Sequence, residues 1–178
     1  NDIRALRKGR GLTLKDLATA IGRSLGWLSQ IERGQTEPSV RDLGHIADQL
    51  GINISFFFRS GSRQEAERGL VLRAADRVPI GSVASGLTEE LLSPTLSGSF
   101  EMIKSVFAPR SHSGGPLPAR AREDGGVLVS GQLTLTIGDL TVDLAPGDSF
   151  QFSQRDYAWR SPHDEPATVI WVISPPVY

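Results

Sequence analysis

The sequence contains no cysteine and only three histidines among its 178 residues. Without thiols there is no disulfide and no cysteine-ligated metal, which fits a reducing compartment, so we expect a cytoplasmic protein. Apolar runs are short as well. Residues 169–173 form the longest candidate, far below the ~20 residues that a membrane-spanning helix needs, so we expect no membrane association. No secretory signal is visible, and because the chain begins at Asn1 we expect preceding residues to be missing.

Net charge is also nearly absent, at a formal -1, but the charged residues are unevenly distributed. Residues 1–60 have nine basic side chains against six acidic ones, whereas residues 61–178 have ten against fourteen. A basic first part joined to an acidic remainder favours nucleic-acid binding by the first part alone. An excess of +3 is too small to establish this without a motif.

Residues 11–34 have the pattern of two short helices joined by a sharp turn. The first helix has an apolar stripe at 3.6-residue spacing, formed by Leu14, Leu17, Ala18 and Ile21. Gly22 can adopt the positive φ with which a chain leaves a helix, and Ser24 is placed to cap the second helix. Further helices are expected at residues 2–8, 40–50 and 54–58, which together make a compact five-helix, all-α domain.

The pattern changes after residue 58. Residues 59–69 are rich in Ser, Gly, Gln, Glu and Arg and are expected to form a linker. From residue 70 the apolar period becomes two, which predicts an all-β sandwich or barrel. We therefore expect domains at 1–58 and 70–178 with the linker between them. The expected strands are residues 70–78, 87–92, 97–108, 126–129, 132–137, 140–144, 149–152, 157–160 and 167–173.

Residues 3–58 resemble the helix-turn-helix domain of the Xre/Cro/lambda-repressor group. The matching residues are Gly11-Leu-Thr, Leu17-Ala18, Ile21-Gly22, Ser24, Leu28-Ser-Gln-Ile-Glu-Arg-Gly34, Glu37-Pro-Ser and Leu50-Gly51. Residues 97–175 resemble a small cupin, through Gly126-Val-Leu-Val-Ser-Gly-Gln-Leu, Leu144-Ala-Pro-Gly-Asp-Ser and Asp164-Glu-Pro-Ala. The combination is similar to Xre-type regulators with a C-terminal cupin sensor. It implies a lambda-repressor-like domain followed by a double-stranded β-helix, or jelly-roll barrel.

The resemblance places the second helix of the motif in a DNA major groove. The positions that reach base edges would be Leu25, Gly26 and Gln30, and of these Gln30 can bond adenine bidentately. Because Leu25 offers only apolar contact and Gly26 has no side chain, we expect DNA shape to contribute. Supplementary contacts are expected from Arg23, Ser24 and Ser29.

Phosphate contacts are expected from Arg33 and from helix N-termini, including Thr13. Lys15 is expected to help, as are Arg7, Arg10 and Arg41. Glu32 is interpreted as a structural partner for a basic residue, and Trp27 is expected either to pack or to contact the DNA backbone. One domain would contact few phosphates, so we expect a homodimer on double-stranded operator DNA.

The cupin resemblance normally implies a metal held by histidines and a glutamate. Here no histidine falls on those positions, so we predict no metal, no cofactor and no enzyme activity. An alternative is a metal-dependent cupin enzyme with a DNA-binding head, its metal held by His112, Glu123 and Asp124. A third reading, a helix-turn-helix that contacts protein, is disfavoured by its basic outer face.

We expect the barrel instead to bind a small organic effector and to dimerise the chain. Arginines near its mouth, including Arg110, Arg155 and Arg160, allow the effector to be anionic, with Arg120 or Arg122 pairing to its charge. The expected lining is Phe107, Arg120, Arg122, Asp124, Phe152, Tyr157, Trp159 and Trp171.

Overall fold

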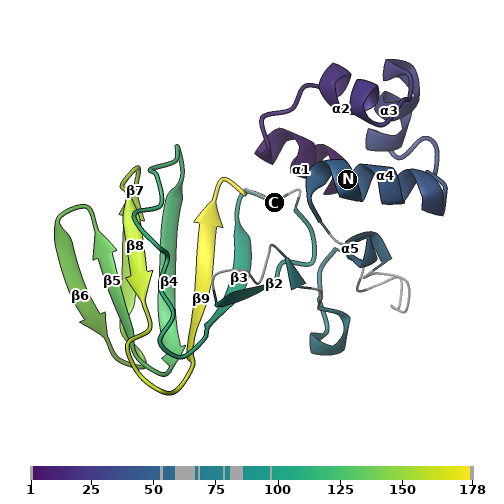
Figure 1. The fold of residues 1–178 in the computed structure, drawn as a ribbon. Helices are drawn as coiled ribbons and strands as arrows, with labels where there is room; N and C mark the ends of the chain where they lie inside the picture. The colour runs from purple at the N-terminus through teal and green to yellow at the C-terminus, as the bar shows by residue number, and fades with distance from the viewer. Residues whose placement is uncertain are drawn as a thin grey trace. The chain divides into compact units, whose positions relative to one another are not determined.

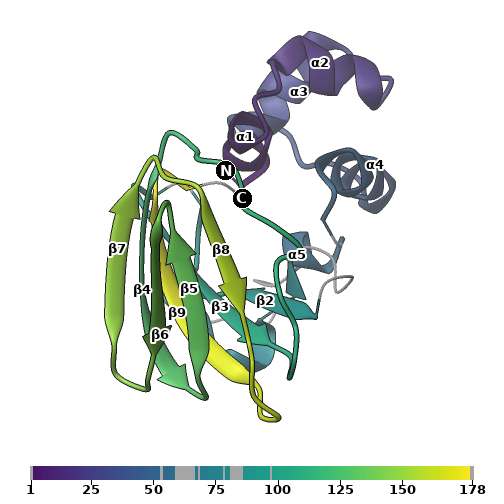
Figure 2. The same ribbon diagram turned by 60° about the vertical axis from the view of Figure 1, so that its left-hand side comes forward.

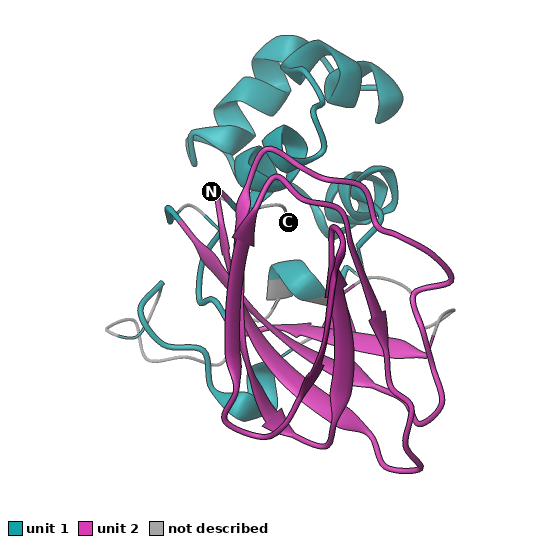
Figure 3. Cartoon of the chain, turned by 90° about the vertical axis from the view of Figure 1, so that its left-hand side faces the viewer, with its two compact units in different colours: residues 1–78, 93–99, 176–178 teal, residues 79–92, 100–175 magenta. Residues whose placement is uncertain are grey.

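The computed structural model describes residues 2–52, 54–58, 67, 69–77, 79–80, 86–96 and 98–176. Figure 3 shows that the chain forms two compact units. One comprises Asn1–Val78, Ser93–Ser99 and Pro176–Tyr178, and the other comprises Pro79–Leu92 and Phe100–Pro175. Most of the predicted linker lies outside the described residues. None of the described helices is both long and apolar enough to cross a lipid bilayer.

The first unit is helical, as Figure 1 shows. Its core is formed by side chains without exposed surface, among them Leu6, Leu17, Leu28, Ile46 and Leu50. Four helices have seven residues or more and a fifth is a single turn: α1 (Asp2–Gly9), α2 (Leu14–Ala20), α3 (Leu25–Glu32), α4 (Val40–Leu50) and α5 (Ser55–Phe58).

Local capping explains where these helices start and stop. Thr13 and Ser39 each begin a capping box, with Asp16 at the start of α2 and with Asp42 at the start of α4. Ser24 caps α3 by accepting the backbone N–H of Trp27 at 3.2 Å. The chain leaves α4 at Gly51, whose φ of 61° is accessible to glycine at little cost.

The second unit is built from antiparallel strands in two sheets, one of six strands in the order β1-β2-β3-β9-β4-β7 and one of three in the order β6-β5-β8 (Figures 1 and 2). The sheets contact each other through aromatic rings, including Phe107 against Trp159. The strands are β1 (Pro79–Ile80), β2 (Leu87–Leu91), β3 (Glu101–Phe107), β4 (Glu123–Ser130), β5 (Leu133–Ile137), β6 (Leu140–Leu144), β7 (Ser149–Ser153), β8 (Tyr157–Arg160) and β9 (Ala167–Ser174).

One predicted strand is wrong. Residues 70–78 were expected to extend along a sheet, but the described part contains a 3₁₀ helix, η2 (Ala74–Asp76), and the short strand β1 begins only at Pro79. Leu70 is 76% exposed, so its alternation with Leu72 does not mark a buried face. Alternation produces a strand only where a neighbouring strand offers hydrogen bonds and a core to cover.

The connection between β2 and β3 belongs to the helical unit. Residues 93–99 cluster with α1 rather than with the strands that flank them. Leu96 is buried there, and its backbone N–H donates to the Asp2 carboxylate at 3.2 Å. Sequence reasoning had assigned this whole segment to the β domain, because nothing in its composition indicates where it packs.

Candidate functional site

The outer face of α3 is the first candidate surface. Leu28 and Ile31 are buried in the helical core, whereas Gln30 and Gly26 are exposed and Leu25 keeps 48% of its surface. These exposed residues share the side of the helix that has no packing role. The predicted base-reading positions therefore lie together on one accessible face.

Gln30 and Gly26 are both open to a partner. The Thr36 hydroxyl contacts Gln30 Oε1 at 3.5 Å, which leaves the Gln30 side chain exposed. A Cβ built on Gly26 would meet nothing within 4 Å. The packing of the free protein thus does not require glycine at position 26. The lack of a side chain there matters only if the surface of a partner approaches the α3 backbone closely.

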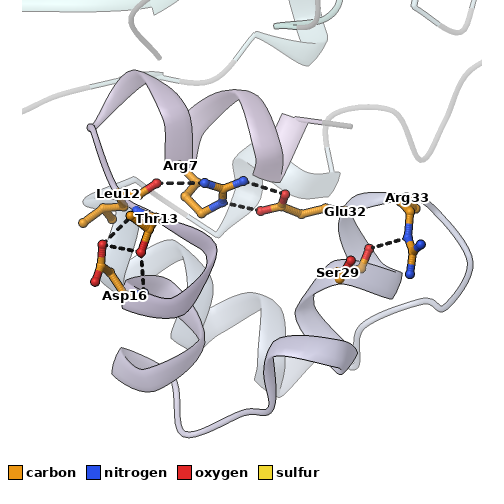
Figure 4. Close-up of polar contacts among 7 residues, drawn as sticks. All are labelled: Arg7, Leu12, Thr13, Asp16, Ser29, Glu32 and Arg33. Atoms are coloured by element: carbon orange, nitrogen blue, oxygen red, sulfur yellow. Dashed lines mark hydrogen bonds and ion pairs between the residues drawn. The ribbon is translucent and has the colours of Figure 1, made fainter.

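Two predicted phosphate contacts are also engaged within the protein, as Figure 4 shows. Thr13 bonds the Asp16 carboxylate through its hydroxyl at 2.6 Å and through its backbone N–H at 2.8 Å. These bonds lower the pKa of Asp16 and put a negative charge at the start of α2. Arg33 donates Nε to the Ser29 carbonyl at 3.2 Å, which leaves its other guanidinium nitrogens exposed. Lys15 is exposed.

Arg7 is not on the outer face, contrary to expectation. Its Nε and Nη2 donate to the two oxygens of Glu32 at 2.6 and 2.9 Å, and its Nη1 donates to the Leu12 carbonyl at 2.8 Å (Figure 4). Both side chains are buried, and the bond to Glu32 raises the pKa of Arg7. The interpretation of Glu32 as a structural partner is confirmed, and its partner is the arginine that we expected on DNA.

Arg23 is likewise held by a carboxylate. Its Nε and Nη2 donate to one oxygen of Asp42 at 3.0 and 2.6 Å, and its guanidinium lies 5.1 Å from the centre of the Trp27 ring. The other Asp42 oxygen accepts the hydroxyl of Ser39 at 2.7 Å. The hydrogen bond from Ser39, followed by that from Arg23, holds the pKa of Asp42 below its usual range.

The second candidate site is the aromatic interior of the β unit. Phe107 and Trp159 meet edge to face with centroids 4.7 Å apart. Tyr157 lies 5.3 Å from the ring of Phe152 and 5.9 Å from that of Trp171. The five aromatic residues predicted to line the barrel thus lie in two groups of contacting rings, Phe107 with Trp159 and Phe152 with Tyr157 and Trp171.

Charged groups reach the same interior. Arg122 Nε donates to Asp124 Oδ2 at 3.0 Å, and both side chains are buried. Asp124 Oδ1, although 2.9 Å from the same nitrogen, accepts no hydrogen bond among the described residues. Burial raises the pKa of Tyr157; the charge of Arg122 opposes this, Asp124 and Glu89 reinforce it, and Arg120 opposes it. Four charged side chains, Arg122, Asp124, Glu89 and Arg120, thus act on the Tyr157 hydroxyl.

The predicted lining did not include Glu89, whose charge acts on the Tyr157 hydroxyl. Glu89 accepts the Ser105 hydroxyl at 2.9 Å between the paired strands β2 and β3. Phe150 packs 4.8 Å from Trp171, and its ring fills the space that a side chain at Gly126 would need. The available signal was the alternation of β2, which puts Glu89 on the same face as Leu87 and Leu91.

The predicted arginine rim is dispersed. Arg110 pairs with Asp164, both exposed, and Arg160 is an exposed residue that lines a surface hollow with Thr134, Asp143 and His163. Arg120 is exposed. Successive side chains of β8 point to opposite faces of the sheet. Arg160 therefore lies on the face opposite to the interior that contains Tyr157 and Trp159.

The alternative metal site does not form. No group of three His, Asp or Glu side chains in the described part of the chain is arranged to hold a metal ion. His112 accepts the Gly114 N–H on Nδ1, Glu123 contacts Gln151, and Asp124 is paired with Arg122. Each of the three candidate ligands is therefore engaged with another partner, and they are not grouped as a metal site.

Comparisons with known proteins agree with this architecture. The helix-turn-helix family model matches residues 3–57 and the cupin domain model matches residues 105–173. The HTH-type transcriptional regulator DdrOP3 of Deinococcus deserti is 46% identical over 52 residues, which cover 29% of this chain and 40% of that protein. The chain thus spans less than half the length of this relative.

A second relative is matched over most of its length. The transcriptional regulator ClgR of Mycobacterium tuberculosis is 31% identical over 97 residues, 53% of this chain and 86% of that protein. The crystal structure of Fe(II) HppE, 16% identical, covers 96% of this chain and 95% of its own with a TM-score of 0.52, which shows likeness of fold. The chain therefore belongs to the helix-turn-helix family of transcriptional regulators and has a cupin domain after its helix-turn-helix domain.

Proposed function

We propose that this protein is a dimeric transcription regulator that binds operator DNA through α3 and a small effector through its cupin domain. The observation that carries the proposal is the exposed face of α3. Gln30, Gly26 and Leu25 are exposed to solvent there, while the opposite face of the helix is packed in the core. A helix presented in this way after a turn is the geometry that enters a major groove.

In this proposal Gln30 reads a base and Arg33 positions the phosphate backbone. Gln30 has the amide oxygen and nitrogen that bond adenine N6 and N7. The exposed nitrogens of Arg33 suit a phosphate, and Ser24, Ser29 and Lys15 are proposed to add contacts. Thr13 would contribute through the end of α2, where Asp16 competes with phosphate for the same donors.

The test starts from a pool of random duplexes selected with the wild-type chain. Gln30→Ala should change base preference at one position of the selected site, whereas Arg33→Ala should weaken all duplexes about equally. Affinity should fall steeply with salt, by about one log unit of binding constant per log unit of salt for each phosphate contact. Failure to select any sequence, or salt-independent binding, would refute the proposal.

For the cupin domain we propose a closed barrel whose interior receives the effector between Tyr157, Trp171 and Asp124. The polar capacity left at Asp124 Oδ1 supports an effector with a hydrogen-bond donor. An anionic group would have to use Arg120, because Arg122 is already paired. Calorimetry of small carboxylates against their amides, with Arg120→Ala as control, separates these choices.

Dimerisation and domain organisation complete the proposal. We place the DNA-binding domain at residues 1–58, the linker at 59–69 and the sensor at 70–178, although residues 70–78 and 93–99 cluster with the helical unit. Two copies would read two half-sites about one DNA turn apart. Sedimentation equilibrium on the full chain tests this: a monomer at the concentrations that saturate DNA would contradict it. We assign no catalytic role, since no group of His, Asp or Glu side chains among the described residues is arranged to hold a metal ion.

A further inference from the structure

We propose that Arg23 is a positioning residue that sets α3 for DNA reading, and that it does not itself contact phosphate. This inference rests on the proposed DNA binding and changes the role expected for Arg23 from sequence. The residue stands just before Ser24, the cap of α3, and so is attached to the end of the helix that would enter the groove first.

The geometry gives Arg23 two fixed neighbours. On one side, two of its nitrogens converge on a single oxygen of Asp42, whose side chain is 9% exposed. On the other side, its guanidinium covers the ring of Trp27, a residue of the first turn of α3. One side chain thus ties α3 to the start of α4.

Asp42 is itself immobilised. Its second oxygen accepts the hydroxyl and the backbone N–H of Ser39, at 2.7 and 3.3 Å, in the capping box of α4. A carboxylate bonded on both oxygens has little freedom, so the direction of the Arg23 guanidinium is determined by α4. We infer that Trp27, and Leu25 beside it, are oriented by this chain of contacts.

A phosphate contact would need an arginine whose positive charge is not already paired with a carboxylate. The positive charge of Arg23 is already neutralised by Asp42, and a neutralised arginine releases few counterions from DNA. The side chain nevertheless remains 47% exposed, so a role in DNA binding cannot be decided by burial alone. The two roles make opposite predictions for the partner residue.

Asp42→Asn separates the two roles. This variant keeps an oxygen for the Ser39 bonds but weakens the hold on Arg23. If Arg23 positions α3, affinity for the selected duplex should fall about fivefold, a fold-change equivalent to the loss of a partly exposed ion pair. If Arg23 binds phosphate, the freed guanidinium should leave affinity unchanged or raise it, which would overturn the inference.

Arg23→Ala gives the matching measurement. We expect a similar fivefold loss with an unchanged salt dependence, and relaxed preference at the base pair beside Leu25 while the Gln30 preference stays. Loss of a phosphate contact would instead reduce the salt slope by about 0.9 and leave base preference intact. The double variant should bind no more weakly than the worse single variant, because both remove the same contact.

Two controls keep the result interpretable. Arg4→Ala removes one exposed positive charge from α1 of the same unit and should cost less affinity than Arg23→Ala. Arg23→Lys can pair with Asp42 but cannot converge two nitrogens on it, so it should recover base preference only in part. Circular dichroism at the assay temperature shows that each variant is folded. If the wild-type chain selects no duplex, the proposed function fails; an altered salt slope in Arg23→Ala overturns only this inference.

Discussion

Both units bury an arginine beside a carboxylate, but the two pairs differ in how completely they are bonded. Arg7 and Glu32 share two parallel hydrogen bonds, and the remaining donor of Arg7 reaches the Leu12 carbonyl. Arg122 donates Nε to Asp124 Oδ2 at 3.0 Å, and Asp124 Oδ1, 2.9 Å from the same nitrogen, accepts no hydrogen bond among the described residues. The first pair is therefore more completely hydrogen-bonded than the second.

The difference reflects where each unit exposes its function. In the helical unit the buried charges of Arg7 and Glu32 pair with each other and join α1 to α3 across 25 residues of sequence. The proposed DNA contacts of this unit are exposed side chains. In the β unit the proposed binding groups lie inside, so their bonding must stay incomplete. Buried polar groups that are fully satisfied stabilise a fold, and partly satisfied ones indicate an interaction still to be made.

The largest expected effect comes from Glu32→Gln. It leaves the buried Arg7 without its countercharge, so the helical unit should lose about 3 kcal/mol or more of unfolding free energy. Urea unfolding followed by circular dichroism at 222 nm measures this loss. Replacing both residues, Arg7→Met with Glu32→Leu, should cost less than Glu32→Gln alone. A single variant as stable as wild type would show that the pair is not a structural tie.

Asp124→Asn is the matched change in the β unit and should cost less, about 1 kcal/mol. Fewer bonds are lost, and the amide keeps an oxygen for Arg122. Unfolding is followed by the fluorescence of Trp159 and Trp171, with Trp27→Phe in the background so that only the β unit is observed. A loss as large as that for Glu32→Gln would contradict the comparison.

The two units should also differ in how their stability depends on pH. Because the pKa values of Asp42 and Asp16 are lowered in the folded chain, the stability they contribute is present above the ordinary Asp pKa of 3.8 and is lost as pH falls through the lowered values. The pKa of Tyr157 is raised by burial, so its contribution is present below the ordinary value of 10.0 and is lost as pH rises through the raised value.

Thermal unfolding between pH 3 and pH 11, read by the same two signals, measures this contrast. The helical signal should weaken first on the acid side, and Asp42→Asn should flatten part of that dependence. The β-unit signal should weaken on the alkaline side, and Tyr157→Phe should remove that change. The reverse order would mean that other groups control the pH response.

The smallest expected effect is on stability in Gly26→Ala. Alanine stabilises a helix by about 0.5–1 kcal/mol relative to glycine, and the new Cβ meets nothing in the free protein. The melting temperature should therefore rise slightly while affinity for the selected duplex falls, if DNA approaches α3 closely at this point. Ala20→Gly, an exposed helical change of opposite sign, serves as the stability control. Unchanged DNA affinity would remove Gly26 from the binding surface.

Much of the helical unit was predictable because its signals are local. Thr13, Ser24 and Ser39 each cap a helix within three residues of themselves. Buried apolar residues three or four positions apart, such as Leu28 and Ile31 in α3 and Ile46 and Leu50 in α4, mark the buried faces. The β strands after residue 86 followed from alternation in the same way. The failure at residues 70–78 shows the limit, since alternation there had no sheet to join.

The roles of single polar residues were less accessible. The sequence indicated that Glu32 is a structural partner but not that Arg7 is the residue it pairs with. Arg23 was predicted to contact DNA because its ion pair with Asp42 is not visible in the sequence. Glu89 was missed because a carboxylate in a strand is usually solvated. The five aromatic residues of the predicted lining pack against other rings, and their role in effector binding stays a prediction.

The sequence by itself determined the two families, the helix boundaries near the turn from α2 to α3 and the absence of a cupin histidine set. These depend on residues within a few positions of one another. Only the tertiary structure decided which arginines remain available, because Arg7 meets Glu32 and Arg23 meets Asp42 across 25 and 19 residues of chain. Charge is visible in the sequence, but whether it is neutralised depends on the path that the chain takes.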